Sequence, residues 1–150
     1  MRSHWKLTNQ SKSDIDAAVE QKLEMVGMLD TIEKMPSQLS GGMKKRIALA
    51  RALMLDPELI LYDEPSAGLD PVTSSMIDEL MISLSEKLGC ASVIVTHELD
   101  SAFKVGTRIA MLYQGVVIAD GPPEQFRDHS NPVVAQFIAG ETEGPLSQSR

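Results

Sequence analysis

The chain has 150 residues, of which 43% are hydrophobic and 23% charged, as in a globular protein with one sizeable core. Its net charge of -7 argues against nucleic acid or an anionic membrane surface as the main partner, because both bind basic surfaces. The single cysteine, Cys90, excludes an internal disulfide and is typical of a reducing cytoplasm, and no secretory signal or bilayer-spanning apolar run is visible.

A cap and an apolar stripe predict a first helix that begins after Ser13. Asp16, three residues later, completes a capping-box pattern, and Gly27 is a suitable terminator. The apolar face of this helix would consist of Ile15, Val19, Leu23 and Val26. We therefore expect one side of the helix to face a core.

A second helix is predicted after Ser40, and it should end before Asp56-Pro57 because a proline disfavours helical backbone at the preceding residue. The basic run Lys44-Lys45-Arg46 is expected to form a solvated face of this helix. The expected apolar stripe is Met43, Ile47, Ala50 and Met54. The segment from Leu59 to Tyr62 is a short continuous apolar run, which is typical of a strand buried on both faces.

Asp70-Pro71 predicts the start of a third helix, with Asp as the cap and Pro at the first helical position, and Gly89 closes it. Its apolar positions are Ile77, Leu80, Met81, Leu84 and Leu88. A second buried strand over Val93 to Val95 and a short helix from Glu98 to about Val105 follow. A strand, a helix and a strand in this order form a right-handed parallel unit.

The last third of the chain predicts a hairpin and two small helices. Two strands, Arg108 to Tyr113 and Val116 to Ala119, flank the turn Gln114-Gly115. The helices are expected near Pro123 to Arg127 and Pro132 to Ile138.

Polar residues follow both predicted parallel strands. Asp63-Glu64 ends the first strand and His97 follows the second, so both are expected at the edge where parallel sheets bind ligands. A carboxylate there can hold a phosphate-bound Mg²⁺ through water, and a neighbouring carboxylate can act as a general base, worth about 10²–10⁴ in rate. The alternative is a solvated carboxylate pair at a strand end.

Ser40-Gly41-Gly42 opens the second helix and predicts a phosphate site. Backbone N–H groups at a helix start point outward, and glycine lets a phosphate approach closely. The alternative is an ordinary cap followed by flexible glycines. The order of motifs favours the phosphate site, because Leu-Ser-Gly-Gly, the Asp-Glu-Pro strand, Ala-Gly-Leu-Asp-Pro and the strand ending in His97 occur as one ordered set.

With these motifs the chain resembles the ATP-binding cassette (ABC) ATPases over nearly its whole length. Ser40 to Met43 matches the signature motif, Asp63 and Glu64 match the Walker B aspartate and catalytic glutamate, Ser66 to Asp70 matches the D-loop, and His97 matches the switch histidine. The resemblance implies an α/β fold, a partial P-loop NTPase-like cassette. It would comprise the helical signature subdomain and the C-terminal part of the parallel-sheet ATPase core.

In that family two cassettes meet head to tail, and the signature of one binds the ATP held by the other. The resemblance implies that Ser40, Gly41 and Gly42 bind nucleotide in trans, with Ser40 and Gly42 at the γ-phosphate. Asp70 would contribute to nucleotide binding by coupling the two sites across the dimer.

The remaining site residues would act on the ATP held by their own cassette. The resemblance implies that Glu64 is the catalytic base and that His97 bonds the γ-phosphate in cis. Asp63 would hold Mg²⁺ through water, and only when nucleotide is bound. ATP and Mg²⁺ are thus the expected cofactors of the complete cassette.

One family motif is absent from the sequence: no Gly-x-x-x-x-Gly-Lys-Ser/Thr loop occurs in it. We therefore expect the chain to start inside the helical subdomain, as a truncated gene model, a split gene or an assembly fragment, and these residues alone are not expected to bind or hydrolyse ATP. The expected division is a helical subdomain over about 1–56, a core portion over about 57–139 and a flexible tail over 140–150.

Short cues point to a subfamily. Met43 replaces the glutamine common at the end of the signature, and Gln136 to Gly140 with Glu143 to Pro145 is similar to the cassettes of Mla/Mce-type phospholipid transporters. The resemblance implies a lipid-transport ATPase on the cytoplasmic face of the inner membrane. Its partners would be a second ATPase subunit and a transmembrane permease, with no nucleic acid.

Two alternatives stay open at this point, and a third is disfavoured. The chain could serve an importer of amino acids or another substrate. It could be a non-catalytic regulatory module that lends its signature to a full-length cassette. A DNA-repair or chromosome-organising ATPase would need a heptad coiled coil before Leu39, and none is present in the sequence.

Overall fold

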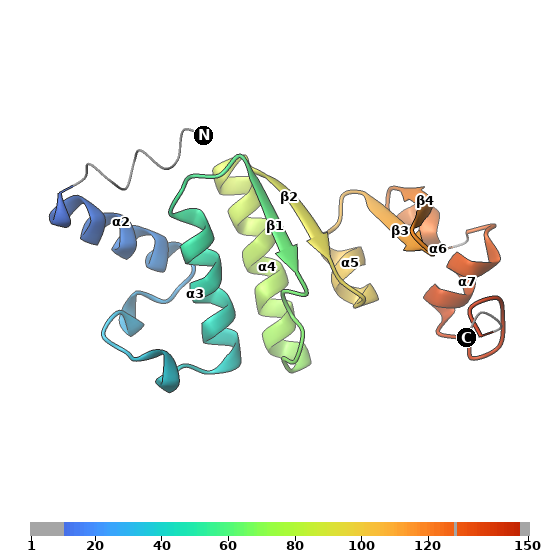
Figure 1. The fold of residues 1–150 in the computed structure, drawn as a ribbon, viewed down its shortest axis with the longest axis horizontal. Coiled ribbons are helices and arrows are strands. Elements are labelled where there is room, and N and C mark those ends of the chain that lie inside the picture. The colour runs from blue at the N-terminus through green and yellow to red at the C-terminus, as the bar shows by residue number, and fades with distance from the viewer. Residues whose placement is uncertain (1–10, 128, 148–150) are drawn as a thin grey trace. The chain divides into compact units, whose positions relative to one another are not determined.

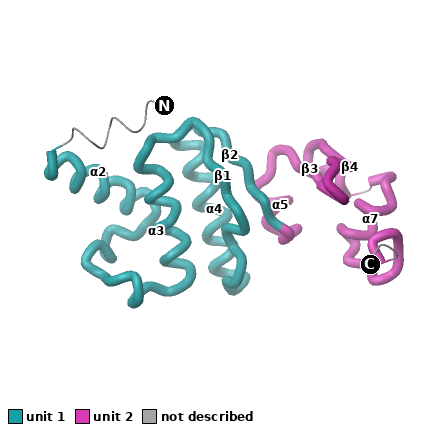
Figure 2. The backbone as a smooth tube through the Cα atoms, viewed as in Figure 1, with its two compact units in different colours: residues 1–96 teal, residues 97–150 magenta. Residues whose placement is uncertain are grey.

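The computed structural model of the chain describes residues 11–127 and 129–147. The chain divides into two compact units, residues 1–96 and residues 97–150 (Figure 2). The first unit contains α2 (Lys12–Met25), the 3-10 turns η1 (Leu29–Thr31) and η2 (Pro36–Gln38), α3 (Gly41–Leu53), β1 (Leu59–Asp63), α4 (Pro71–Leu88) and β2 (Ala91–Val95). The second unit contains α5 (Leu99–Val105), β3 (Ile109–Tyr113), β4 (Val116–Gly121), α6 (Glu124–Arg127) and α7 (Pro132–Ala139) (Figure 1).

Helix α2 begins two residues earlier than predicted. Its cap is Ser11, whose Oγ accepts from the Asp14 N–H at 3.2 Å, while the Asp14 carboxylate accepts from the Ser11 N–H at 3.2 Å. Ser11 and Asp14 have the same spacing as the predicted pair, Ser13 and Asp16, so the earlier box takes the cap and adds half a turn of helix. Gly27, at φ +67°, follows the helix end as predicted.

Helix α3 begins after Ser40 and ends at Leu53, which confirms the predicted bounds, but its predicted stripe is only partly right. The fully buried side chains are Leu49, Ala50 and Leu53, whereas Met43, Ile47 and Met54 are half-buried. The physical reason is that α3 packs against both α2 and α4, so the buried surface of this helix is wider than one stripe.

Strands β1 and β2 pair in parallel, in a register that runs from Leu59 beside Ala91 to Asp63 beside Val95. The apolar runs predicted strands suited to burial on both faces. One face is covered, where Ile60 and Tyr62 are buried, and the other is open, with Leu61 72% exposed and Val95 58% exposed. Within the described residues this sheet has two strands.

The crossover helix α4 connects the two parallel strands and has the predicted ends. Asp70 caps it, Pro71 is its first residue, and Gly89 ends it in the left-handed conformation at φ +62°. Its inner face is fully buried at Ile77, Met81 and Leu84. These side chains are the centre of the core of the first unit.

The second unit contains the predicted hairpin. Gln114 and Gly115 have φ of +47° and +81°, and two positive φ values in succession are the signature of the tight turn that joins antiparallel strands. Its core consists of Ala119, Phe126 and Val134, with Phe103, Ile109, Met111, Ile118 and Ile138 packed around them. The two predicted small helices are confirmed as α6 and α7.

Ionic and amide contacts hold the hairpin strands together and fix the residues that follow α7. Arg108 donates two hydrogen bonds to the Asp120 carboxylate, at 2.8 and 2.7 Å, and this guanidinium holds the pKa of Asp120 below its usual range. The buried Gln136 side chain of α7 donates to the Glu141 carbonyl at 3.1 Å and accepts from the Leu146 N–H at 2.8 Å. The described part of the predicted tail therefore folds back on α7.

Among residues 11–127 and 129–147, no helix has the length and apolar character needed to cross a membrane.

Candidate functional site

The predicted phosphate site lies at the start of α3. Ser40 caps the helix, and its Oγ accepts from the Met43 N–H at 3.3 Å. Ser40 and Gly41 are exposed, whereas Gly42 is buried. The first turn of a thirteen-residue helix with an exposed cap offers backbone N–H groups to an anion.

The two glycines of this turn also have a packing role that the sequence did not indicate. A Cβ atom on Gly42 would lie 2.6 Å from Cγ2 of Thr73, and one on Gly41 would lie 3.3 Å from Cδ2 of Leu69. Glycine is therefore required at position 42 for the start of α3 to pack against the start of α4. Glycine at position 42 therefore serves helix packing as well as any close approach of a phosphate.

Asp70 lies beside this contact. Its carboxylate accepts from the N–H groups of Val72 and Thr73, both at 3.1 Å, and from the Thr73 hydroxyl. The Thr73 hydrogen bonds hold the pKa of Asp70 below its ordinary value. Thr73 thus bonds Asp70 through its hydroxyl and faces Gly42 with its methyl group. These contacts bring the signature turn and the D-loop together within one chain.

Asp63 and Glu64 lie at the C-terminal end of β1. Asp63 is exposed and pairs with Val95 of β2, and Glu64 is half-buried. Glu64 has a φ of +46°, and its N–H donates to the Val95 carbonyl at 2.9 Å. Positive φ in a non-glycine residue costs about 1–2 kcal/mol and marks a position that its surroundings hold in place.

Sequence reasoning missed the role of the basic run on α3. The prediction of a solvated face is confirmed for Lys44, which is exposed. It is wrong for Lys45 and Arg46, which are half-buried. Lys45 Nζ donates to the Glu64 carbonyl at 2.8 Å, and Arg46 Nη1 donates to the Val26 carbonyl at 3.3 Å. Successive helical residues point about 100° apart, so three adjacent cations on a helix packed on two sides cannot share one environment. No spacing rule signals a contact across 19 residues.

His97 is exposed and follows the end of β2 by two residues, as the first residue of the second unit. The described residues contain no group of three or more His, Cys, Asp or Glu side chains that could hold a metal ion. The role of Asp63 in holding Mg²⁺ through water stays a prediction.

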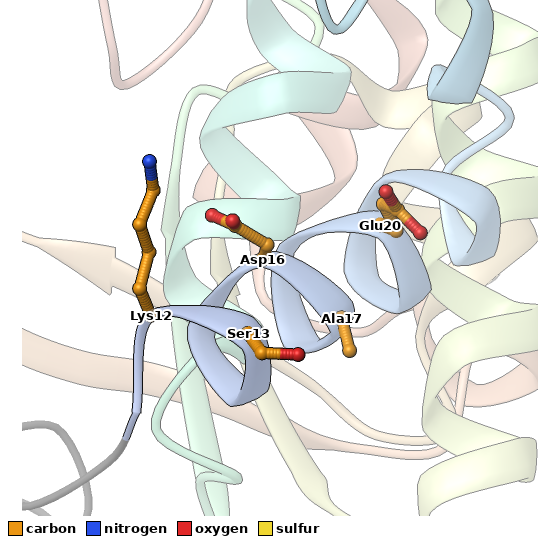
Figure 3. Close-up of a pocket in the computed structure, with 5 residues that line it drawn as sticks. All are labelled: Lys12, Ser13, Asp16, Ala17 and Glu20. Carbon is orange, nitrogen blue, oxygen red and sulfur yellow. The ribbon is translucent and has the colours of Figure 1, made fainter.

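A shallow hollow lies against α2, well apart in sequence from these motifs. It is lined by Lys12, Ser13, Asp16, Ala17 and Glu20, all exposed and all from one helix (Figure 3). A hollow of this kind does not enclose a ligand, so it adds no candidate site.

Sequence comparison with known proteins points to the same family as the motifs do. Residues 2–67 match the ABC transporter family. The chain is 38% identical, over 99% of its length, to the probable ribonucleotide transport ATP-binding protein Mkl of Mycobacterium leprae. It is 41% identical, over 83% of its length, to the intermembrane phospholipid transport system ATP-binding protein MlaF of Haemophilus influenzae. It spans 42% of the first relative and 47% of the second, less than half of each.

Solved cassettes share the fold. CbiO1 of Clostridium perfringens, part of the ABC transporter complex CbiONQ, is 30% identical with a TM-score of 0.75, over 81% of this chain and 49% of CbiO1. The cassette MJ0796, a dimer bound to ADP and Pi, is 33% identical with a TM-score of 0.67, over 78% of this chain and 50% of that one. These similarities confirm the predicted α/β fold of a partial cassette and the likeness to Mla-type proteins. In sequence and fold, the chain is similar to part of an ATP-binding cassette of ABC transporters.

Proposed function

We propose that this chain is part of the ATP-hydrolysing subunit of an ABC transporter that moves phospholipid. The observation that carries the ATPase assignment is the end of β1, where Glu64 is held at φ +46° by hydrogen bonds from its N–H to β2 and to its carbonyl from α3. The similarity to MlaF, which is named for phospholipid transport, supports the lipid assignment.

Glu64, Asp63 and His97 would act on the ATP of their own cassette. Glu64 would accept a proton from the water that attacks the γ-phosphorus, and ADP would leave as the bond to the γ-phosphate breaks. Asp63 is the residue that would hold Mg²⁺ through water, and this ion would neutralise charge on the phosphate oxygens. His97 would donate a hydrogen bond to the γ-phosphate.

Ser40, Gly41 and Gly42 would bind the γ-phosphate of ATP held by a second cassette. The exposed cap and the helix start supply a hydroxyl and backbone N–H groups for this contact. Asp70 would couple the two sites, since the D-loop packs against this turn. The dimeric form of the similar cassette MJ0796 supports such an arrangement.

The assembly would include a transmembrane permease, with the cassette pair on the cytoplasmic face of the inner membrane. ABC ATPases act as dimers with permease partners, and the similar protein CbiO1 is part of such a complex.

A complete cassette, meaning this chain joined to a half that carries the phosphate loop, should hydrolyse ATP. Replacing Glu64 by Gln keeps size and hydrogen bonding but removes the base, so turnover should fall by about 10²–10⁴ while ATP binding survives. Phosphate release and calorimetric ATP binding measure the two effects. Glu58→Gln is the control, because Glu58 is an exposed glutamate at the opposite end of the same strand.

Two results would contradict the ATPase assignment. Normal turnover in Glu64→Gln would show that Glu64 is not the general base. A complete wild-type cassette that binds ATP but does not hydrolyse it would favour the regulatory-module alternative, in which the chain lends only its signature turn.

The transported substrate needs its own test, since the name of the similar protein Mkl refers to ribonucleotide transport. We expect the cassette, assembled with its permease in vesicles, to drive ATP-dependent transfer of a fluorescent phospholipid. ATP-dependent uptake of a labelled ribonucleotide without lipid transfer would replace the lipid assignment and leave the ATPase assignment intact.

A further inference from the structure

The contact between Lys45 and Glu64 has a role that the family motifs do not assign. Lys45 lies on α3, one turn beyond the signature residues, and its Nζ donates to the Glu64 carbonyl at 2.8 Å. Both residues are half-buried, so water competes only in part for this bond. A hydrogen bond from a charged donor is stronger than one between neutral groups.

Three hydrogen bonds hold the backbone of Glu64 in place. Its N–H donates to the Val95 carbonyl of β2 at 2.9 Å, and its carbonyl accepts from the Ala67 N–H at 3.3 Å and from Lys45. The first bond extends the β1–β2 ladder, and the second closes a local turn. The bond from Lys45 is the one that comes from a separate helix, and it is the shortest of the three.

From this geometry we propose that Lys45 is a positioning residue for hydrolysis, which holds the Glu64 backbone in its left-handed conformation and thereby aims the Glu64 carboxylate. The proposal rests on the proposed function, because it gives Lys45 a role in that reaction. Without the bond, Glu64 relaxes toward the ordinary negative φ region, and its side chain turns with the backbone. A misplacement of about 1 Å at a reacting group costs about 10²-fold in rate.

The same bond links two functions within one subunit. Ser40 at the start of α3 faces one nucleotide in the proposed dimer, and Glu64 serves another. Lys45 joins the helix that carries the first to the strand end that carries the second.

The test compares Lys45→Met with Lys44→Met in the complete cassette. Methionine keeps the length of the side chain and removes the donor, and Lys44 is the exposed neighbour with the same charge. We expect Lys45→Met to lower kcat by at least about tenfold at nearly unchanged KM for ATP, and Lys44→Met to leave both unchanged. Lys45→Arg, which keeps a charged donor, should restore most of the turnover.

A second readout does not depend on turnover. Amide hydrogen exchange at Glu64 and Ala67 should become about tenfold faster in Lys45→Met than in the wild type, and Lys44→Met should match the wild type. Unchanged exchange and unchanged kcat in Lys45→Met would overturn the role of Lys45 while leaving the ATPase assignment standing. A wild-type cassette without turnover would remove the ATPase assignment, and exchange would still decide whether Lys45 holds Glu64. If Lys45→Met does not fold, Lys45→Leu, which also lacks a donor, provides the same comparison.

Discussion

The parallel pair β1–β2 and the antiparallel pair β3–β4 each have two strands, but they differ in how they are completed. The hairpin is closed by the turn Gln114-Gly115, and its inner side packs on the small core around Phe126. The parallel pair is joined through α4 and carries Asp63 and Glu64 at its end. It leaves an apolar face open, made of Leu59, Leu61, Val93 and Val95.

This difference teaches where the chain depends on partners. The antiparallel strands are neighbours in sequence, because a two-residue loop joins them. Parallel strands usually occur in sheets covered on both sides, so we expect the open face of β1–β2 to be covered in a complete cassette. The proposed chemistry is concentrated on the pair that is open.

The largest contrast should appear in activity between two histidines. His97 follows β2, whereas His129 lies between α6 and α7, where its ring accepts from the Asn131 N–H at 3.0 Å. In the complete cassette, His97→Ala should lower turnover by about 10²-fold or more through loss of the γ-phosphate contact, and His129→Ala should leave it unchanged. Equal turnover in both variants, measured by phosphate release, would remove His97 from the mechanism.

The next contrast concerns association of the 150-residue polypeptide on its own. Its open parallel face should make it self-associate, and Leu61→Lys should lower this association strongly, because it places a charge in the centre of that face. Leu112→Lys is the matched comparison: Leu112 is 67% exposed on the hairpin, where it pairs with the exposed Val117, and its replacement should lower association less, because this two-residue patch is smaller than the open face of the parallel pair. Light scattering measures both.

A monodisperse wild-type monomer with a sharp two-state thermal transition would contradict this view of the parallel pair. It would show that the described sheet is self-sufficient, and the regulatory-module alternative would gain support.

The smallest contrast concerns stability at the signature turn. Gly42→Ala should lower the free energy of unfolding by about 1–3 kcal/mol, because its Cβ would lie 2.6 Å from Cγ2 of Thr73. Thr73→Ser removes that methyl group and keeps the hydroxyl that bonds Asp70, so the double variant should recover most of the loss. Denaturant unfolding of the complete cassette gives both values. Additive effects of the two substitutions would mean that this contact does not explain the glycine.

Local signals in the sequence were enough for most of the fold. Caps and terminators predicted α4 between Asp70 and Gly89, and the turn Gln114-Gly115 predicted the hairpin. A serine can serve as a cap at either of two positions in one region, so the start of α2 was misplaced by two residues. The apolar run of β1 indicated a strand suited to burial on both faces, but such a run does not indicate what covers each face, and one face is open.

The candidate site was predictable in its motifs and unpredictable in its contacts. Asp63, Glu64 and Ser40 were found by spacing and order, because the chemistry needs those residue types at those places. Lys45 and Thr73 were missed, because their roles arise from tertiary contacts to Glu64 and Gly42, and single-sequence patterns carry no signal for such contacts.

The central claim is that the start of α3 and the end of β1 serve different ATP molecules. Ser40 would act in trans, on the ATP held by the second cassette, and Glu64 in cis, on the ATP of its own cassette. It is tested most directly by mixing two inactive complete cassettes, one with Glu64→Gln and one with Ser40→Asp. Aspartate caps a helix as well as serine does, so Ser40→Asp keeps α3 and repels phosphate by charge. Ser40→Asn is the neutral capping control.

If Ser40 acts in trans, the mixture should regain ATPase activity. About half of the dimers should be mixed, and each of these has one intact site out of two, so activity can reach about a quarter of the wild-type value. Each variant alone should stay inactive, and Ser40→Asn should retain turnover. A mixture that stays as inactive as its components, under conditions where mixed dimers form, would contradict the claim.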